Sequence, residues 1–113
     1  MLLSSLFDLH QVGYMDASLI FELNNEAFQL EAEKLESGAY YVIFKDQTAG
    51  VKTYPSGRYM VTEIASGDSV YIDFNRAYNP PCAFTDHATC PLPTAQNILE
   101  TKISAGEIFS QLS

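Results

Sequence analysis

The alternation of apolar and polar positions along the chain predicts β-strands rather than helices. Apolar side chains occupy every second position over residues 19–23 and again over residues 28–32, which is the period of a strand with one buried face. Asn24-Asn25 suits a tight turn between them because asparagine tolerates positive φ. The pattern therefore predicts a β-hairpin. A helix over residues 26–36 is the competing interpretation, since Glu, Ala, Leu and Lys favour helices, Asn25 could cap its start and Gly38 its end.

Three further segments also have strand character. Residues 40–44 form an unbroken aromatic and β-branched run, which is too short for a helix and predicts a central strand covered on both faces. After a loop over residues 45–57, residues 59–64 and 69–74 flank a four-residue turn and predict a second hairpin. Residues 98–103 predict a last strand.

Six predicted strands without a long amphipathic helix indicate a mainly β fold, either a small antiparallel sandwich or a partly open barrel. The length of 113 residues suits one core and one domain. Four of the five prolines and both cysteines lie in residues 75–97, which favours a long ordered loop. The expected order is a short helical or frayed lead (1–17), strands and hairpins (18–74), the long loop (75–97) and a last strand (98–107).

Composition and charge narrow the classes of partner. Hydrophobic residues make up 47% of the chain and charged residues 18%, a balance that argues against disorder. The net charge is −8, of which −6 falls in residues 1–36. No nucleic-acid partner is expected, because such binding needs a basic face. Residues 1–36, the acidic third of the chain, predict a solvated face, and the alternative is a docking surface for a basic partner.

The first residues and the cysteine count bear on location. Residues 1–7 are mostly apolar, but Asp8 ends the run and no basic segment precedes it, so it is too short for a signal peptide. No apolar run is long enough to span a membrane. Two cysteines are too few for a disulfide scaffold. We therefore expect a cytoplasmic protein with no membrane partner.

A series of short motifs stands out from the strand pattern. It comprises Phe44-Lys45-Asp46-Gln47-Thr48-Ala49-Gly50, Tyr54-Pro55-Ser56-Gly57-Arg58-Tyr59, Asp73-Phe74-Asn75-Arg76-Ala77-Tyr78-Asn79-Pro80-Pro81-Cys82-Ala83, Cys90-Pro91-Leu92-Pro93, Asn97 and Ala105-Gly106-Glu107. The series resembles a family of bacterial and archaeal proteins of unknown function. Thr94 and Gln96 depart from its pattern, and residues 1–17 are shorter than the usual N-terminal region. The resemblance favours strand over helix for residues 26–36, and it implies a fold and a site location without any reaction, substrate or cofactor.

The arginines of this motif series suggest a ligand site. A guanidinium presents a planar fork of donors that suits a carboxylate or a phosphate. Arg58 either pairs with Asp73 across the second hairpin or clamps an anionic ligand. Asn75 and Asn79 either stabilise the turns before Pro80 or bind the ligand directly. The candidate pocket for a small polar or anionic molecule comprises Arg58, Asp73, Asn75, Arg76, Tyr78 and Asn79.

Cys82, His87 and Cys90 carry a second hypothesis. Thiolate and imidazole are zinc ligands, although the spacing is not that of a zinc finger. Buried structural thiols, a disulfide or redox pair and a metal site stay open as interpretations. The leading function is a non-catalytic binding or accessory domain. One alternative is an enzyme that uses these three residues with or without zinc. The other is an interaction module or homodimer built on the acidic third or an exposed strand edge.

Overall fold

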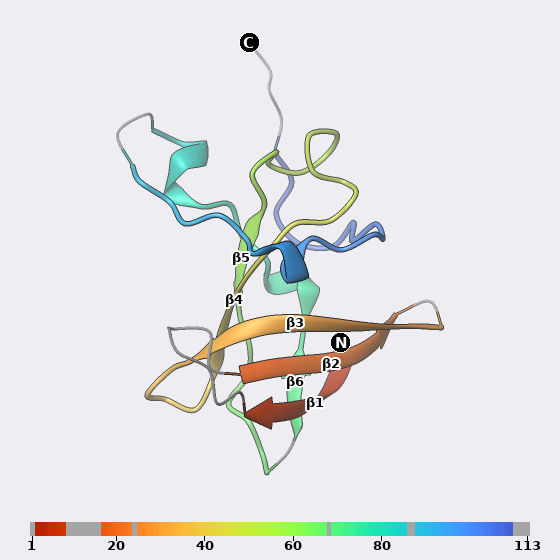
Figure 1. Ribbon diagram of the computed structural model, residues 1–113. Helices are drawn as coiled ribbons and strands as arrows, with labels where there is room; N and C mark the ends of the chain where they lie inside the picture. Colours follow the sequence, from red (N-terminus) through yellow and green to blue (C-terminus); the bar gives the residue numbers. More distant parts are fainter. Residues whose placement is uncertain (1, 9–16, 24, 68, 86–87, 110–113) are drawn as a thin grey trace.

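The protein is built on one antiparallel sheet. The structure is a computed structural model that describes residues 2–8, 17–23, 25–67, 69–85 and 88–109, the first of these ranges as backbone only. Its strands lie in the order β5-β4-β3-β2-β1-β6 (Figure 1), which confirms the predicted mainly β antiparallel fold. The strands are β1 (Leu2–Asp8), β2 (Ala17–Leu23), β3 (Glu26–Lys34), β4 (Tyr40–Phe44), β5 (Arg58–Val61) and β6 (Ser69–Ile72).

The first predicted hairpin is confirmed as β2 and β3. Phe21 pairs with Phe28 and Leu19 with Leu30, and Asn25 adopts the positive φ of 66° that the turn requires. Leu30 and Ala32 are buried while their neighbours are less so, the period of a strand. The alternative helix over residues 26–36 is wrong, because β3 pairs with β2 along its length and with β4 at its end.

The N-terminal segment differs from the prediction of a helical or frayed lead. Residues 2–8 form β1, which pairs with β2 on one side and with β6 on the other. Its partner β6 lies more than 60 residues away in the sequence, so no local pattern could indicate this pairing. Residues 9–16 of the predicted lead lie outside the described residues.

The predicted last strand over residues 98–103 is also wrong. Only a single parallel bridge joins Ile98 to Lys45, with Leu99 N donating to Lys45 O at 2.7 Å and Gln47 N donating to Thr101 O at 2.8 Å. Residues 97–101 therefore run beside the continuation of β4 without forming a strand.

The second predicted hairpin forms only at its turn and at the ends of the strands next to it. Ser66 and Ser69 exchange backbone hydrogen bonds of 2.8 and 3.1 Å, and Glu63 N donates to Tyr71 O at 3.4 Å. The strands themselves occupy opposite edges of the sheet. The sheet bends so that β1–β3 cross the direction of β4, β5 and β6 (Figure 1). The bent sheet resembles a partly open barrel, but it is not closed.

The core fills the concave side of this bent sheet. Phe74 packs against both parts of the bent sheet. Its ring centroid lies 5.6 Å from that of Phe21 on β2 and 5.5 Å from that of Phe44 on β4. Three short 3-10 turns, Phe74–Arg76, Pro81–Ala83 and Ala95–Asn97, interrupt otherwise irregular chain. Among the described residues, no helix is long and apolar enough to cross a bilayer. The buried cluster comprises Ala17, Leu19, Phe21, Leu30, Ala32, Tyr40, Val42, Phe44, Met60, Val70, Ile72, Phe74, Ala77, Leu99 and Ile103.

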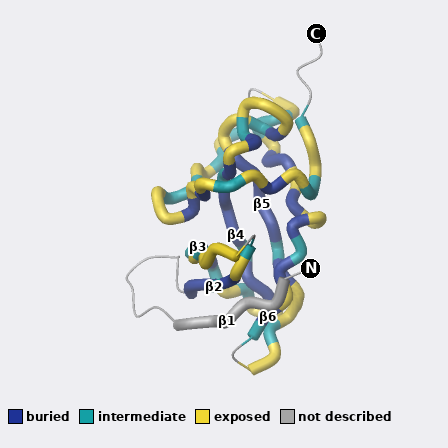
Figure 2. The backbone as a smooth tube through the Cα atoms, turned by 90° about the vertical axis from the view of Figure 1, so that its right-hand side faces the viewer, coloured by how far each residue is buried: buried dark blue, intermediate teal, exposed yellow. Residues whose placement is uncertain are grey.

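Most residues of β4 and β5 are buried, and burial extends into the irregular segments beyond them (Figure 2). All residues of β4 except Tyr41 are buried, which confirms the prediction of a central, doubly covered strand. Leu99 and Ile103 join the core from the C-terminal segment. This segment, residues 97–109, therefore covers the sheet in place of a second sheet.

Gly57→Ala is expected to destabilise the protein far more than Gly50→Ala. Both glycines have positive φ, 107° and 81°, but an added Cβ at Gly57 would lie 2.5 Å from Phe44 O, while at Gly50 it would meet nothing within 4 Å. Each substitution costs about 1–2 kcal/mol for the left-handed backbone, and overpacking adds roughly 1–3 kcal/mol at Gly57 alone. Urea unfolding of both variants measures the difference. Equal losses would mean that the backbone at Gly57 moves freely.

Candidate functional site

Arg58 lies at the centre of a buried polar cluster, which we call the arginine centre: Arg58, Asp46, Thr48 and Thr53 with the carbonyl groups of Ile103, Ala105 and Glu107. Only 1% of Arg58 is exposed. Its Nη2 donates to Ile103 O at 2.9 Å and to Asp46 Oδ1 at 3.4 Å, and its Nη1 donates to Ala105 O and, at 3.4 Å, to Glu107 O. Its guanidinium also lies 5.2 Å from the ring centroid of Phe44.

Asp46 holds the other side of the arginine centre. Its Oδ2 accepts hydrogen bonds from Thr48 Oγ1 and Ile103 N, each at 2.7 Å, and from Thr48 N at 3.2 Å. Thr48 Oγ1 and Thr53 Oγ1 lie 2.9 Å apart in a further hydrogen bond. Desolvation lowers the pKa of Arg58, and the neighbouring Asp46 carboxylate acts in the opposite direction. Because the ordinary pKa of arginine is so high, the side chain stays charged.

These contacts answer the two interpretations of Arg58. Its partner is Asp46 rather than Asp73, so the predicted pair across the second hairpin is wrong. Both terminal nitrogens of the guanidinium are engaged with protein oxygens, and Arg58 Nε is buried without a partner among the described residues. These contacts give Arg58 a structural role, because they link residues 45–57 to the C-terminal segment.

Gly106 allows the C-terminal segment to approach Arg58. Its φ is +90°, and an added Cβ would lie 2.6 Å from Phe74 O and 2.9 Å from Arg58 Nη1. Only glycine fits this position without displacing its neighbours. The Ala105-Gly106-Glu107 motif thus has a packing explanation that links it to the Gly57-Arg58-Tyr59 motif.

Asp73, Asn75 and Arg76 lie in a turn at the surface, and their hydrogen bonds and ion pair do not involve Arg58. Asp73 caps the 3-10 turn Phe74–Arg76, and its Oδ1 accepts a hydrogen bond from Asn75 N at 3.1 Å. Arg76 Nη1 pairs with Glu63 Oε2 at 3.2 Å, and both side chains are about half exposed. The structure does not bring these three residues together with Arg58 in one pocket.

Tyr78 and Asn79 lie between the exposed turn and the C-terminal segment. Tyr78 and Tyr59 exchange backbone hydrogen bonds of 2.8 and 2.9 Å, which cover the outer edge of β5. Asn79 is 5% exposed; its N donates to Glu107 Oε1 at 2.7 Å and its Nδ2 to Ile108 O at 3.3 Å. Its Oδ1 is buried and has no partner among the described residues. The contacts of Asn79 and Glu107 hold the chain end in place.

Cys82 and Cys90 form a disulfide. This is one of the three interpretations that the sequence left open. Sulfur atoms joined to each other are neither thiolate ligands nor nucleophiles. His87 lies outside the described residues, and within the described part of the chain no three Cys, His, Asp or Glu side chains gather as metal ligands do.

Tyrosine side chains fasten the disulfide loop to the sheet. Tyr54 Oη donates to Cys82 O and Tyr59 Oη donates to Pro91 O, both at 3.2 Å. The Tyr59 ring packs edge-on against Tyr41 at 5.5 Å and against Tyr78 at 5.9 Å between centroids. Desolvation raises the pKa of all three phenols, Tyr41, Tyr59 and Tyr78, and most strongly that of Tyr41.

Asn97 is the residue whose role sequence reasoning missed most clearly, although it belongs to the motif series. Strands β3 and β4 pair only at Glu33–Tyr41 and Lys34–Tyr40 and then separate. In the gap, Asn97 Nδ2 donates to Glu31 O and Ile43 O at 2.8 Å, and Asn97 Oδ1 accepts from Glu31 N at 2.7 Å. Its 1% exposure shows that the amide replaces strand pairing inside the protein.

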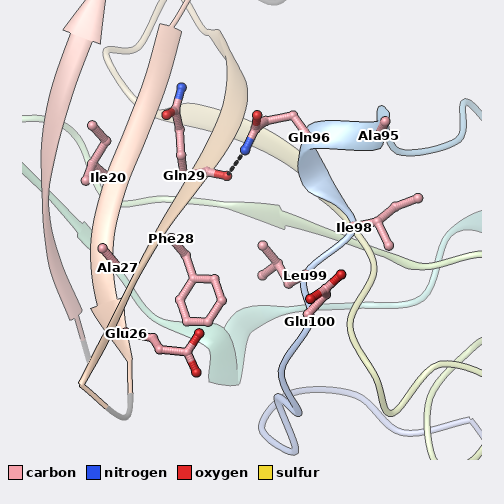
Figure 3. A pocket seen from close by; sticks show the side chains of 10 residues that line it. All are labelled: Ile20, Glu26, Ala27, Phe28, Gln29, Ala95, Gln96, Ile98, Leu99 and Glu100. Carbon is pink, nitrogen blue, oxygen red and sulfur yellow. Dashed lines mark hydrogen bonds between the residues drawn. The ribbon is translucent and has the colours of Figure 1, made fainter.

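A groove opens beside Asn97, where β3 and the C-terminal segment diverge. We call it the β3 groove; its volume is about 470 Å³, within the range of small-molecule sites. Gln96 Nε2 donates to Gln29 O at 3.1 Å across one end. Figure 3 shows Phe28 and Leu99 facing each other, with the carboxylates of Glu26 and Glu100 beside them. The lining comprises Ile20, Glu26, Ala27, Phe28, Gln29, Ala95, Gln96, Ile98, Leu99 and Glu100.

The β3 groove was not predicted, because its lining residues come from two distant segments and resemble an ordinary strand and loop. The single available signal was the acidic character of the first third, which includes Glu26. The lining contains two carboxylates and no basic side chain. An anionic ligand, as expected from the arginines, does not suit this groove.

The fold and the arginine centre define a small antiparallel β-domain whose C-terminal segment is fastened by one buried arginine. The chain belongs to the family described as a protein of unknown function (DUF1684), whose model matches residues 8–108. This confirms the predicted resemblance.

A solved structure is similar over most of the chain. It is the solution NMR structure of the uncharacterized protein from gene locus rrnAC0354 of Haloarcula marismortui, with a TM-score of 0.81 and 32% identity. The match covers 95% of this chain and 69% of that chain. A search of the curated proteins found no match. The comparisons thus support the fold and the family and name no activity.

Arg58→Met is expected to cost roughly 3–5 kcal/mol in the free energy of unfolding, because it leaves the buried Asp46 carboxylate and the buried Ile103 carbonyl without their donor. Arg58→Lys should also be strongly destabilising, since one ammonium cannot reach the oxygens that the planar fork reaches. The matched control is Arg76→Met, whose exposed pair is worth about 0–1 kcal/mol. Urea unfolding followed by tyrosine fluorescence gives all three values. Unchanged stability of Arg58→Met would contradict a structural role.

The tyrosine cluster predicts a loss of stability at alkaline pH. The folded state raises the pKa of Tyr41, Tyr59 and Tyr78 above the unfolded value near 10. Their contribution is fully present below pH of about 10 and falls as the pH rises above it, because only the unfolded chain releases the protons. The measurement is the midpoint of urea unfolding as a function of pH. Tyr41→Phe should flatten the fall, whereas Tyr71→Phe, at an exposed position on β6, should not.

Proposed function

We propose that the protein is a non-catalytic binding domain whose β3 groove takes a small organic cation with an apolar part. The observation that carries the proposal is the placement of the Glu26 and Glu100 carboxylates beside an apolar surface formed by Phe28 and Leu99 (Figure 3). A carboxylate pair favours an ammonium or guanidinium group, while the apolar surface favours a ring or an alkyl chain. The net charge of −8 attracts cations over a longer range.

The expected affinity is low. Two exposed ion pairs contribute about 1–2 kcal/mol together, and burial of a ring contributes about 3 kcal/mol. Their sum, about 4–5 kcal/mol, is reduced by the free-energy cost of association, so the expected Kd is about 1 mM or higher. The groove is open to solvent at the exposed residues Glu26, Ala27 and Glu100, which agrees with weak binding and with an accessory role.

Location bears on which ligands the groove meets. A cytoplasmic protein stays a prediction from the sequence. The Cys82–Cys90 disulfide argues against it, because disulfides persist in oxidising compartments and are rare in the cytosol.

Titration with phenylethylamine tests the proposal. The amide resonances of Ala27, Phe28, Leu99 and Glu100 should shift in a saturable way, whereas the isosteric anion phenylpropionate should leave them in place. Glu26→Gln with Glu100→Gln should weaken amine binding at least fivefold, because the loss of two exposed pairs removes about 1 kcal/mol or more.

Glu36→Gln is the matched control, since Glu36 is an exposed carboxylate outside the groove lining. It should leave amine binding unchanged. Equal shifts with the amine and the anion, or no shift at millimolar amine, would rule out a cation site in the groove.

A further inference from the structure

One wall of the β3 groove is an unpaired strand edge. Glu31 directs its backbone N–H and C=O away from β2, because both groups bond to the Asn97 side chain. Residues at every second position of an antiparallel strand share an edge, so Gln29 and Ala27 direct their backbone groups the same way. The Gln29 carbonyl oxygen already accepts a hydrogen bond from Gln96 Nε2. The Gln29 N–H and both backbone groups of Ala27 have no partner among the described residues.

The opposite wall is irregular chain. It comprises the 3-10 turn Ala95–Asn97, the isolated bridge at Ile98 and bends at residues 100 and 101. Asn97 O, Leu99 N and Thr101 O bond to residues 45–47, which holds this wall on the side away from β3. The groove thus has one strand edge, that of β3, and the Phe28 and Leu99 side chains lie between its two walls (Figure 3).

We propose that the partner of the β3 groove is an extended peptide with a basic and an apolar residue two positions apart, which adds to β3 by backbone hydrogen bonds to Ala27 and Gln29. The inference rests on the proposed cation site and names its ligand class. Strand addition gives affinity through the main chain and specificity through alternate side chains. Glu26 and Phe28 are two positions apart on β3 and so share one face of the strand. On the matching face of the peptide, the lysine or arginine side chain faces Glu26 and Glu100, and the apolar side chain packs on Phe28 and Leu99.

Charge decides against a second copy of this chain as the occupant. β3 carries Glu26, Glu31 and Glu33 and a single lysine, Lys34. Edge-to-edge pairing of two β3 strands would bring carboxylates of both copies together, which is destabilising. The other edges are less open, since Tyr78 covers β5. A basic peptide matches both the open edge and the charge.

The decisive experiment is backbone amide hydrogen exchange with and without a capped hexapeptide that carries a lysine and a valine two positions apart and serine elsewhere. The exchange of the Ala27 and Gln29 amides should slow at least tenfold at saturating peptide, and the peptide should bind at least tenfold more tightly than phenylethylamine. The same peptide with glutamate in place of lysine is the control and should cause no slowing. Phenylethylamine itself should shift the groove resonances without slowing these two amides.

The outcomes separate the two proposals. If the amine binds but the lysine–valine peptide leaves the Ala27 and Gln29 amides exchanging freely, strand addition is wrong and the cation site stands. If neither ligand binds, both proposals fail. Slowing that rises with protein concentration in the absence of peptide would show a second copy on the edge and overturn the peptide inference. Loss of peptide binding in Glu26→Gln with Glu100→Gln, and not in Glu36→Gln, would support it.

Discussion

The buried charge of Arg58 is the constraint on which the rest of the structure depends. Removing a guanidinium from water is costly unless oxygen atoms replace the solvent on every side. Asp46 neutralises it at 3.4 Å, and the nearer Ile103 carbonyl at 2.9 Å, with the Ala105 carbonyl, supplies the stronger hydrogen bonds. The chain must therefore bring residues 103–107 back to β5. That requirement explains Gly106, whose missing side chain leaves room for the approach.

The residues of the motif series build the structure around this buried charge, and we call this part of the structure the frame. Asp46, Gly57, Arg58 and Gly106 form the arginine centre and its close contacts, and Asn97 fixes the same C-terminal segment where β3 and β4 separate. Of these residues, Arg58 was expected in a ligand site, because a guanidinium suits an anionic ligand. In this fold their polar groups bind one another and the backbone, which leaves them little capacity for an external ligand.

Sequence reasoning recovered what depends on neighbouring residues. The β2–β3 hairpin, the buried strand β4 and the irregular loop after β6 follow from period, turn residues and proline content. Pairings between distant segments were not accessible in this way: β1 with β6, Arg58 with Asp46 rather than Asp73, and residues 97–101 beside β4. Each of them is decided by the competition among many possible partners, and a local pattern carries no information on which partner wins.

The residues that hold the fold together are also different from the residues that line the β3 groove. The β3 groove lies next to the point where Asn97 fastens the C-terminal segment to Glu31 of β3, but its chemistry comes from Glu26, Phe28 and Glu100, which lie outside the motif series. Under the proposed function, a protein with this frame and other residues at these three positions would keep the groove and prefer a different ligand. The proposal therefore assigns ligand preference to the side chains along the open edge of β3, while the arginine centre and Asn97 hold the C-terminal segment in place.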